Sequence, residues 1–115
     1  MTEKKILNIS SDISLLQTRA LILEQAGYAV TSGSSWIEFE QACGIGSTGY
    51  DLLILGQSLS PSVKHDMTEF AQKYCPQMKI AEFYFSAPST PAKYHFQAGG
   101  KPEEMLSFIA DTLKG

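Results

Sequence analysis

The fold is decided by residues 50–56, Tyr50-Asp51-Leu52-Leu53-Ile54-Leu55-Gly56. Within this stretch four consecutive apolar residues, 52–55, stand between an aspartate and a glycine, with no alternation of apolar and polar side chains. A strand with one solvated face alternates, whereas a strand covered on both faces does not. We therefore expect residues 52–55 to form a central strand of a parallel sheet that has helices on both sides.

Outward from this strand, short apolar runs alternate with amphipathic segments. The expected strands are residues 6–9, 28–31, 52–55, 80–85 and 94–97, and the expected helices are residues 13–26, 36–42, 61–75 and 102–113. Strand–helix alternation favours right-handed crossovers. The sequence therefore predicts an α/β fold with a doubly wound five-stranded parallel sheet, in a single domain that spans residues 1–115.

Composition and charge argue against several classes of partner. The 115 residues carry a formal net charge of -3, and Lys4-Lys5 is the densest basic site. Binding to nucleic acid needs clustered basic residues, so we expect no nucleic-acid partner. No apolar run approaches the roughly 20 residues of a membrane span, and the N-terminus lacks the apolar core of a signal peptide. We expect a cytoplasmic protein with no membrane contact.

Cys43 and Cys75 are lone cysteines that share no CxxC motif and no metal-ligand spacing. A reducing compartment accounts for them most simply, with both thiols behaving as small apolar side chains. A disulfide between the two is the alternative.

The other residues able to carry chemistry do not assemble into a catalytic or cofactor motif. His65 is expected on a solvated helix face and His95 on the last strand, without ligand partners at metal spacing. Gly44, Gly46 and Gly49 do not follow the dinucleotide-binding fingerprint and predict a flexible loop. We expect no metal, no cofactor and no enzymatic activity.

Several short segments carry a specific resemblance through their order. They are Lys5-Ile6-Leu7, Leu23 to Val30, Tyr50 to Leu55, Cys75 to Ile80, and the pair Lys101-Pro102. Over essentially the whole chain they resemble the receiver domain of response regulators, from two-component signalling and its phosphorelays. The resemblance implies a flavodoxin-like sheet with strand order 2-1-3-4-5 and a role in signal transduction.

The carboxylates that this resemblance implies are missing. A working receiver holds Mg²⁺ with an acidic pair after the first strand and accepts phosphoryl on an aspartate after the third. Here the acidic pair aligns with Ser10 and Ser11, and the acceptor position with Gly56, so no phosphoacceptor is present. Asp51 opens the same strand but lies roughly 15 Å away, at the other end of the sheet.

What remains is a vestigial pocket. Ser86 and Lys101 match the family pattern, and Asp12 could replace one carboxylate if the register slips by a residue. The predicted pocket residues are Ser10, Ser11, Asp12, Gly56, Ser86 and Lys101. Five of them also have an ordinary structural reading. Ser10, Ser11 and Asp12 suffice to cap a helix, Ser86 can bond local backbone, and Lys101 can be a common surface lysine at a helix start.

The interval between Ser86 and Lys101 is a second departure from the resemblance. A receiver places a helix and a strand here, which need roughly 11 and 5 residues before turns are counted. Residues 87–100 cannot comfortably hold both, and Pro88 and Pro91 oppose a regular helix. We expect the fourth helix to be lost or reduced to one turn. Glu82, a charge in an apolar strand, is then expected at a semi-exposed edge, where it discourages edge pairing.

These features favour a pseudo-receiver, a protein-interaction module that works without phosphorylation. The expected partner is a kinase, another receiver, an output domain or a neighbouring domain of a longer chain; a homodimer is a further arrangement. The alternative is a small-molecule or nucleotide sensor that uses the neutralised pocket at the C-terminal edge of the sheet, where Gly56 leaves space and Lys101 suits an anion.

Overall fold

The computed structural model describes residues 3–43 and 49–114. Its strands are β1 (Lys5–Ile9), β2 (Ala29–Gly33), β3 (Leu52–Leu55), β4 (Lys79–Tyr84) and β5 (Tyr94–Gln97). Its helices are α1 (Ile13–Gln25), α2 (Trp36–Cys43), α3 (Pro61–Tyr74) and α4 (Pro102–Lys114). Every predicted element is confirmed, with small shifts of its ends. The predicted loop residues Gly44 and Gly46 lie outside the described residues.

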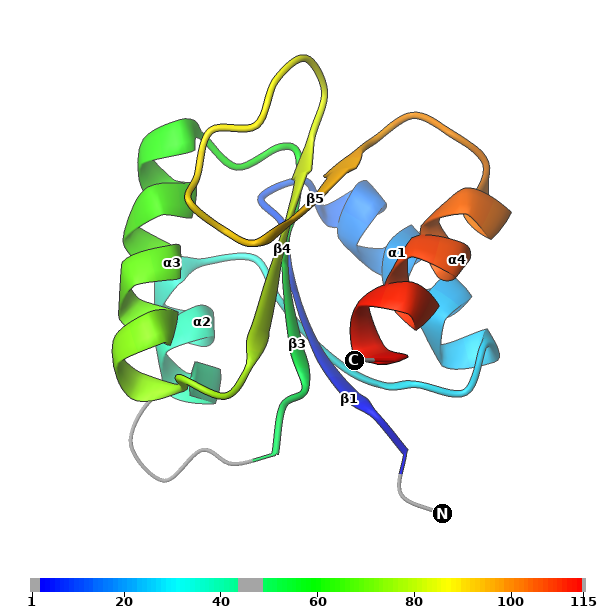
Figure 1. Cartoon of the computed structure of the whole chain (residues 1–115), viewed down its shortest axis with the longest axis horizontal. Helices are drawn as coiled ribbons and strands as arrows, with labels where there is room; N and C mark the ends of the chain where they lie inside the picture. The colour runs from blue at the N-terminus through cyan, green and yellow to red at the C-terminus, as the bar shows by residue number, and fades with distance from the viewer. Residues whose placement is uncertain (1–2, 44–48, 115) are drawn as a thin grey trace.

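The five strands form one parallel sheet in the order β2-β1-β3-β4-β5 (Figure 1). β3 lies at its centre, where Leu53 pairs with Leu7 of β1 and with Ile80 of β4. All four residues of β3 are fully buried. The prediction that an uninterrupted apolar run marks a central strand is therefore confirmed.

The sheet separates two apolar cores because alternate side chains of each strand point to opposite faces. One face packs under α2 and α3, and its cluster includes Leu7, Leu53 and Phe39. The other packs under α1 and α4, with Leu52, Phe83 and Ile109 among its residues. Figure 1 shows these helix pairs on either side of the sheet.

The helices begin where capping side chains satisfy their first amide groups. The Asp12 carboxylate accepts a hydrogen bond from the Leu15 amide at the start of α1, and the Ser60 hydroxyl from the Val63 amide at the start of α3. Gly27, just beyond α1, has a φ of 100°, a conformation that glycine adopts without steric cost. These local signals fix where the loops at each edge of the sheet begin and end.

No helix forms between β4 and β5, as predicted; residues 85–93 are an irregular loop. Figure 1 shows this yellow segment arching over the α3 side of the sheet. Its Ala92 is buried in the core cluster beneath α3. The loop therefore covers part of the face that a fourth helix covers in the receiver pattern.

The prediction that Glu82 lies at a semi-exposed edge is wrong. Glu82 is fully buried, because β5 pairs with β4 and places His95 opposite it. Its charge is satisfied internally: Lys64 Nζ lies 3.2 Å from Oε2, and the amides and hydroxyls of Ser89 and Thr90 donate to the carboxylate. Glu82 thus anchors the loop that replaces the missing helix.

Among the described residues, no helix is long and apolar enough to cross a bilayer.

Candidate functional site

The predicted pocket lies where β1 and β3 end side by side at the C-terminal edge of the sheet. Ser10 follows β1 and Gly56 follows β3. The Gly56 amide donates to the Ile9 carbonyl at 2.8 Å, and the Ser10 amide donates to the Gly33 carbonyl at 3.2 Å. Parallel pairing therefore continues one residue beyond the strands and holds the predicted acceptor position against β1. Both Ser10 and Gly56 are buried.

A third serine, Ser58, joins the two loops at this edge. Its hydroxyl lies 2.8 Å from the Ser10 hydroxyl and accepts from the amides of Ser11 and Asp12, each at 3.2 Å. The Ser11 hydroxyl in turn donates to the Ser58 carbonyl at 3.1 Å. We call Ser10, Ser11 and Ser58 the serine cluster. Its hydroxyls bind one another and the backbone at the edge of the sheet where the pocket was predicted.

Gly56 has no room for a side chain. A Cβ atom there would lie 2.8 Å from the Ile9 carbonyl oxygen and 2.9 Å from the Ser10 Cβ. Carbon atoms in optimal contact are roughly 3.5–4.0 Å apart. The space that the sequence interpretation placed beside Gly56 is therefore filled by the backbone of β1 and by Ser10.

Asp12 and Asp51, the two aspartates considered for this pocket, are already engaged. Asp12 Oδ1 accepts from the Leu15 amide at 3.1 Å as the cap of α1. Asp51 precedes β3 at the opposite end of the sheet, where Oδ2 accepts from the Lys5 amide at 2.8 Å. Asp51 therefore lies at the other end of β3 from Gly56.

The donor set at this edge does not fit the Mg²⁺ ion that receivers use. Magnesium demands octahedral oxygen ligands and is bound through one or two carboxylates together with the substrate phosphate. The serine cluster offers only neutral hydroxyls, and Gly56 at the predicted acceptor position has no side chain that could bind a metal. In residues 3–43 and 49–114, no three His, Cys, Asp or Glu side chains converge as a metal site would require.

Ser86 and Lys101 lie outside the serine cluster. Ser86 is exposed two residues beyond β4. Lys101 is exposed at the start of α4, where its amide donates to Glu104 Oε1 at 3.0 Å. The six predicted pocket residues therefore divide into a joined group at the ends of β1 and β3 and two outlying residues.

Lys101 instead borders an apolar groove between α1, α4 and the ends of β4 and β5. The groove has a volume of about 350 Å³, and its walls include Leu15, Phe85, Phe96 and Met105. Arg19 and Gln57 also line it. Sequence reasoning missed this groove, because its residues come from four separate segments.

Arg19 is the only arginine in the chain, and it is buried beside this groove with 6% of its surface exposed. Its guanidinium donates to Asn8 Oδ1 at 3.3 Å and to Gln57 Oε1, and it lies 4.7 Å from the centre of the Phe83 ring. These partners are neutral, and no ion pair among the described residues includes Arg19. Burial lowers the pKa of Arg19 to about 10.

A five-stranded parallel sheet in the order 2-1-3-4-5, with helices on both faces and polar residues at the β1 and β3 ends, defines the class: the chain has the receiver fold of response regulators. The expected resemblance is confirmed at the level of the fold.

Several solved structures have a similar backbone fold. A response regulator receiver domain protein from Methanospirillum hungatei JF-1 matches with a TM-score of 0.81 and 20% identity, over 98% of this chain and 95% of that one. A response regulator from Thermotoga maritima matches with a TM-score of 0.81 and 10% identity, over 99% of this chain and 100% of that one. A response regulator receiver protein from Sinorhizobium medicae WSM419 matches with a TM-score of 0.77 and 16% identity, over 98% of this chain and 96% of that one.

Sequence comparison alone finds no counterpart: no family model and no curated protein matches the chain. The similarity thus resides in the backbone and topology.

Proposed function

We propose that this chain is a pseudo-receiver, a single signalling domain over residues 1–115 that binds another signalling protein without being phosphorylated or catalysing a reaction. The observation that carries this proposal is the packing at Gly56, where a Cβ atom would lie 2.8 Å from the Ile9 carbonyl oxygen. The proposed partner is a kinase, a receiver or an output domain, separate or in the same chain, and the proposed compartment is the cytoplasm.

The serine cluster supports this proposal through its charge. Phosphoryl transfer gains its rate from groups that neutralise negative charge as it develops, and a metal held by carboxylates is the usual source. Around Gly56 the hydroxyls are neutral and already bonded to one another. The edge is therefore suited to holding the β1–α1 and β3–α3 loops together in one arrangement.

Exposed aromatic residues on α2 and α3 support the interaction role. Trp36 and Tyr74 are 37% and 45% exposed, and Ile37 is 65% exposed. Phe70 joins the two aromatic residues, with ring centres 5.5 Å from Trp36 and 4.6 Å from Tyr74. Contiguous exposed apolar surface on a small domain commonly marks a contact with another protein.

The test of phosphorylation independence is exposure to Mg²⁺ with beryllofluoride, and separately with acetyl phosphate. We expect the amide NMR spectrum to stay unchanged at residues 55–58 and the intact mass to gain no phosphoryl group. A receiver domain with its acceptor aspartate, treated in parallel, should shift. A magnesium-dependent change centred on the serine cluster would refute the proposal.

The buried guanidinium favours a second candidate function, the sensing of a small anion. Arg19 faces a groove of about 350 Å³ and has only neutral partners, so a phosphate or carboxylate would supply the missing countercharge. The apolar walls would receive the rest of the ligand. The proposed ligand site would lie beside Lys101, away from the filled space at Gly56.

A thermal-shift screen against nucleotides and phosphorylated metabolites tests this second function. A ligand at about 100 times its dissociation constant should stabilise the fold by about 2.7 kcal/mol, which raises Tm by several degrees. Arg19→Met should abolish the shift, whereas Lys73→Met, on the opposite helix layer, should keep it. If no compound raises Tm, or if Arg19→Met responds like the wild type, the sensor role is excluded.

A further inference from the structure

Cys43 and Cys75 meet at the edge of the sheet opposite to the serine cluster. Cys43 is the last residue of α2, and Cys75 directly follows α3. Although they are 32 positions apart, their Sγ atoms lie 3.0 Å from each other, and the Cys75 thiol also lies 3.1 Å from the Cys43 carbonyl oxygen. The two side chains therefore already point at one another, as a disulfide requires.

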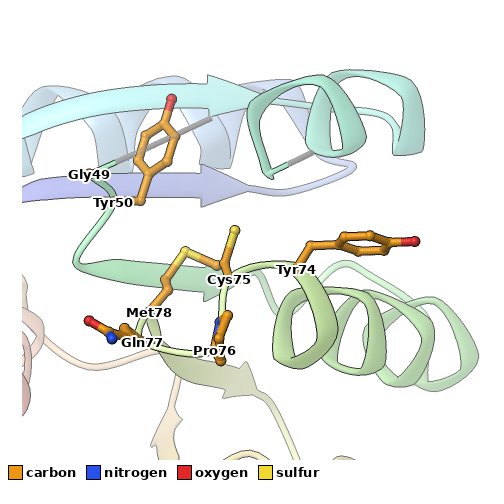
Figure 2. Close-up of a pocket in the computed structure, with 7 residues that line it drawn as sticks. All are labelled: Gly49, Tyr50, Tyr74, Cys75, Pro76, Gln77 and Met78. Carbon is orange, nitrogen blue, oxygen red and sulfur yellow. The ribbon is translucent and has the colours of Figure 1, made fainter. Parts of the chain in front are cut away.

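The two thiols differ in their access to solvent. Cys43 is fully buried, and burial, with the neighbouring Cys75, raises its pKa to about 12. Cys75 is partly exposed and lines an open cavity of about 320 Å³ with Tyr74, Gln77 and Met78. Figure 2 shows the Cys75 sulfur at the end of α3, beside this cavity. Reagents therefore reach Cys75 first.

We propose that Cys43 and Cys75 form a reversible redox site that takes a low-molecular-weight disulfide as its oxidising substrate. The Cys75 thiolate attacks one sulfur of the small disulfide, which forms a mixed disulfide and releases one thiolate. Cys43 then attacks the Cys75 sulfur, and its proton passes to the departing small thiolate. The protein disulfide forms, the second small thiol leaves, and two electrons pass from the protein to the reagent.

The order of attack follows from the burial of the two sulfurs. An incoming disulfide cannot reach Cys43 without opening the core, because this residue packs with Phe39, Leu53 and Ala71. Cys43 needs no access to the reagent in the second step, since its target is the adjacent Cys75 sulfur at 3.0 Å. One cysteine is thus the attacking residue and the other is the resolving residue.

The product would join the C-terminal ends of α2 and α3. Those helices carry the exposed residues Trp36 and Tyr74, with the half-buried Phe70 packed between them. The disulfide would also alter the wall of the cavity that Cys75 lines. The redox site is independent of the proposed pseudo-receiver function, because the serine cluster occupies the other edge of the sheet.

The experiment treats the reduced full chain with oxidised glutathione, followed by intact-mass measurement and thermal unfolding. We expect the main product to lose the mass of two hydrogens, to stay monomeric and to gain roughly 10 °C in Tm, since the bond closes a long loop of the unfolded chain. Dithiothreitol should restore both the original mass and the original Tm.

Two variants test the order of attack. Cys43→Ala should accumulate a stable glutathione adduct at Cys75, because no resolving thiol remains. Cys75→Ser should form no adduct in its folded state, because the remaining thiol is buried. A wild-type product that is a lasting glutathione adduct or a disulfide-linked dimer would overturn the proposal, as would an adduct on folded Cys75→Ser.

Discussion

Replacing Gly56 with aspartate is expected to lower the free energy of unfolding by roughly 3–5 kcal/mol and to create no phosphoacceptor. The new Cβ would lie 2.8 Å from the Ile9 carbonyl oxygen and 2.9 Å from the Ser10 Cβ, so β1 and β3 would have to separate. The carboxylate would also enter a buried position beside a carbonyl group. Urea unfolding of the variant and of the wild type measures the loss.

Gly56→Ala separates the two causes. Alanine introduces the same Cβ without the charge, and we expect it to lose roughly 1–3 kcal/mol. Ser10→Gly removes one of the two contacts, so the double variant should recover part of that loss. If Gly56→Asp instead is as stable as the wild type and gains a phosphoryl group from acetyl phosphate with Mg²⁺, the pocket is not closed and the pseudo-receiver proposal fails.

The layout of the fold was predictable because each element carries its own local signal. Residues 52–55 are apolar without alternation, and Ser60 and Pro61 mark where α3 begins. Pro88 and Pro91 indicated that no regular helix would follow β4. Such signals act over one turn or one strand, so a single sequence displays them.

The contacts within the site were less predictable, because they depend on residues far apart in the chain. Ser10 and Gly56 were found through alignment to the receiver pattern, but Ser58, which joins the loops, carried no signal beyond its place three residues after β3. Arg19 lies on the buried stripe of α1, three residues after Leu16 and four before Leu23, but the helix pattern does not show what would satisfy a guanidinium there. Its burial arises only when Asn8 and Gln57 approach from β1 and from the loop after β3.

The interpretation of Glu82 failed for a related reason. In sequence it is a charge within an apolar strand, and an edge location is the usual way to keep such a charge solvated. The structure solves the same problem with partners from other segments, Lys64 on α3 and the Ser89–Thr90 part of the loop. A buried charge whose partners are distant in sequence cannot be recognised from the strand alone.

Protonation of the buried Glu82 carboxylate is expected to lower the stability of the fold in acid. Burial alone would raise the pKa of this carboxyl, but hydrogen bonds from Ser89, Thr90 and Lys64 outweigh it and lower the pKa from 4.5 to about 2. The stabilisation is therefore fully present above about pH 4.5 and is lost as the pH falls toward about 2. By linkage it is on the order of 3 kcal/mol.

Glu82→Gln isolates this contribution from the other groups that titrate in acid. At pH 7 the variant should be less stable by roughly 3 kcal/mol, because Lys64 stays buried at 4% exposure without its counter-charge. The stability difference between wild type and variant, measured by urea unfolding, should shrink between pH 4.5 and pH 2. Glu24→Gln, an exposed glutamate of α1, should follow the wild type at every pH. A difference that stays constant down to pH 2 would mean that Glu82 does not hold the β4–β5 loop through its charge. In that case the closure of this face would have to rest on the buried Ala92 and its apolar neighbours.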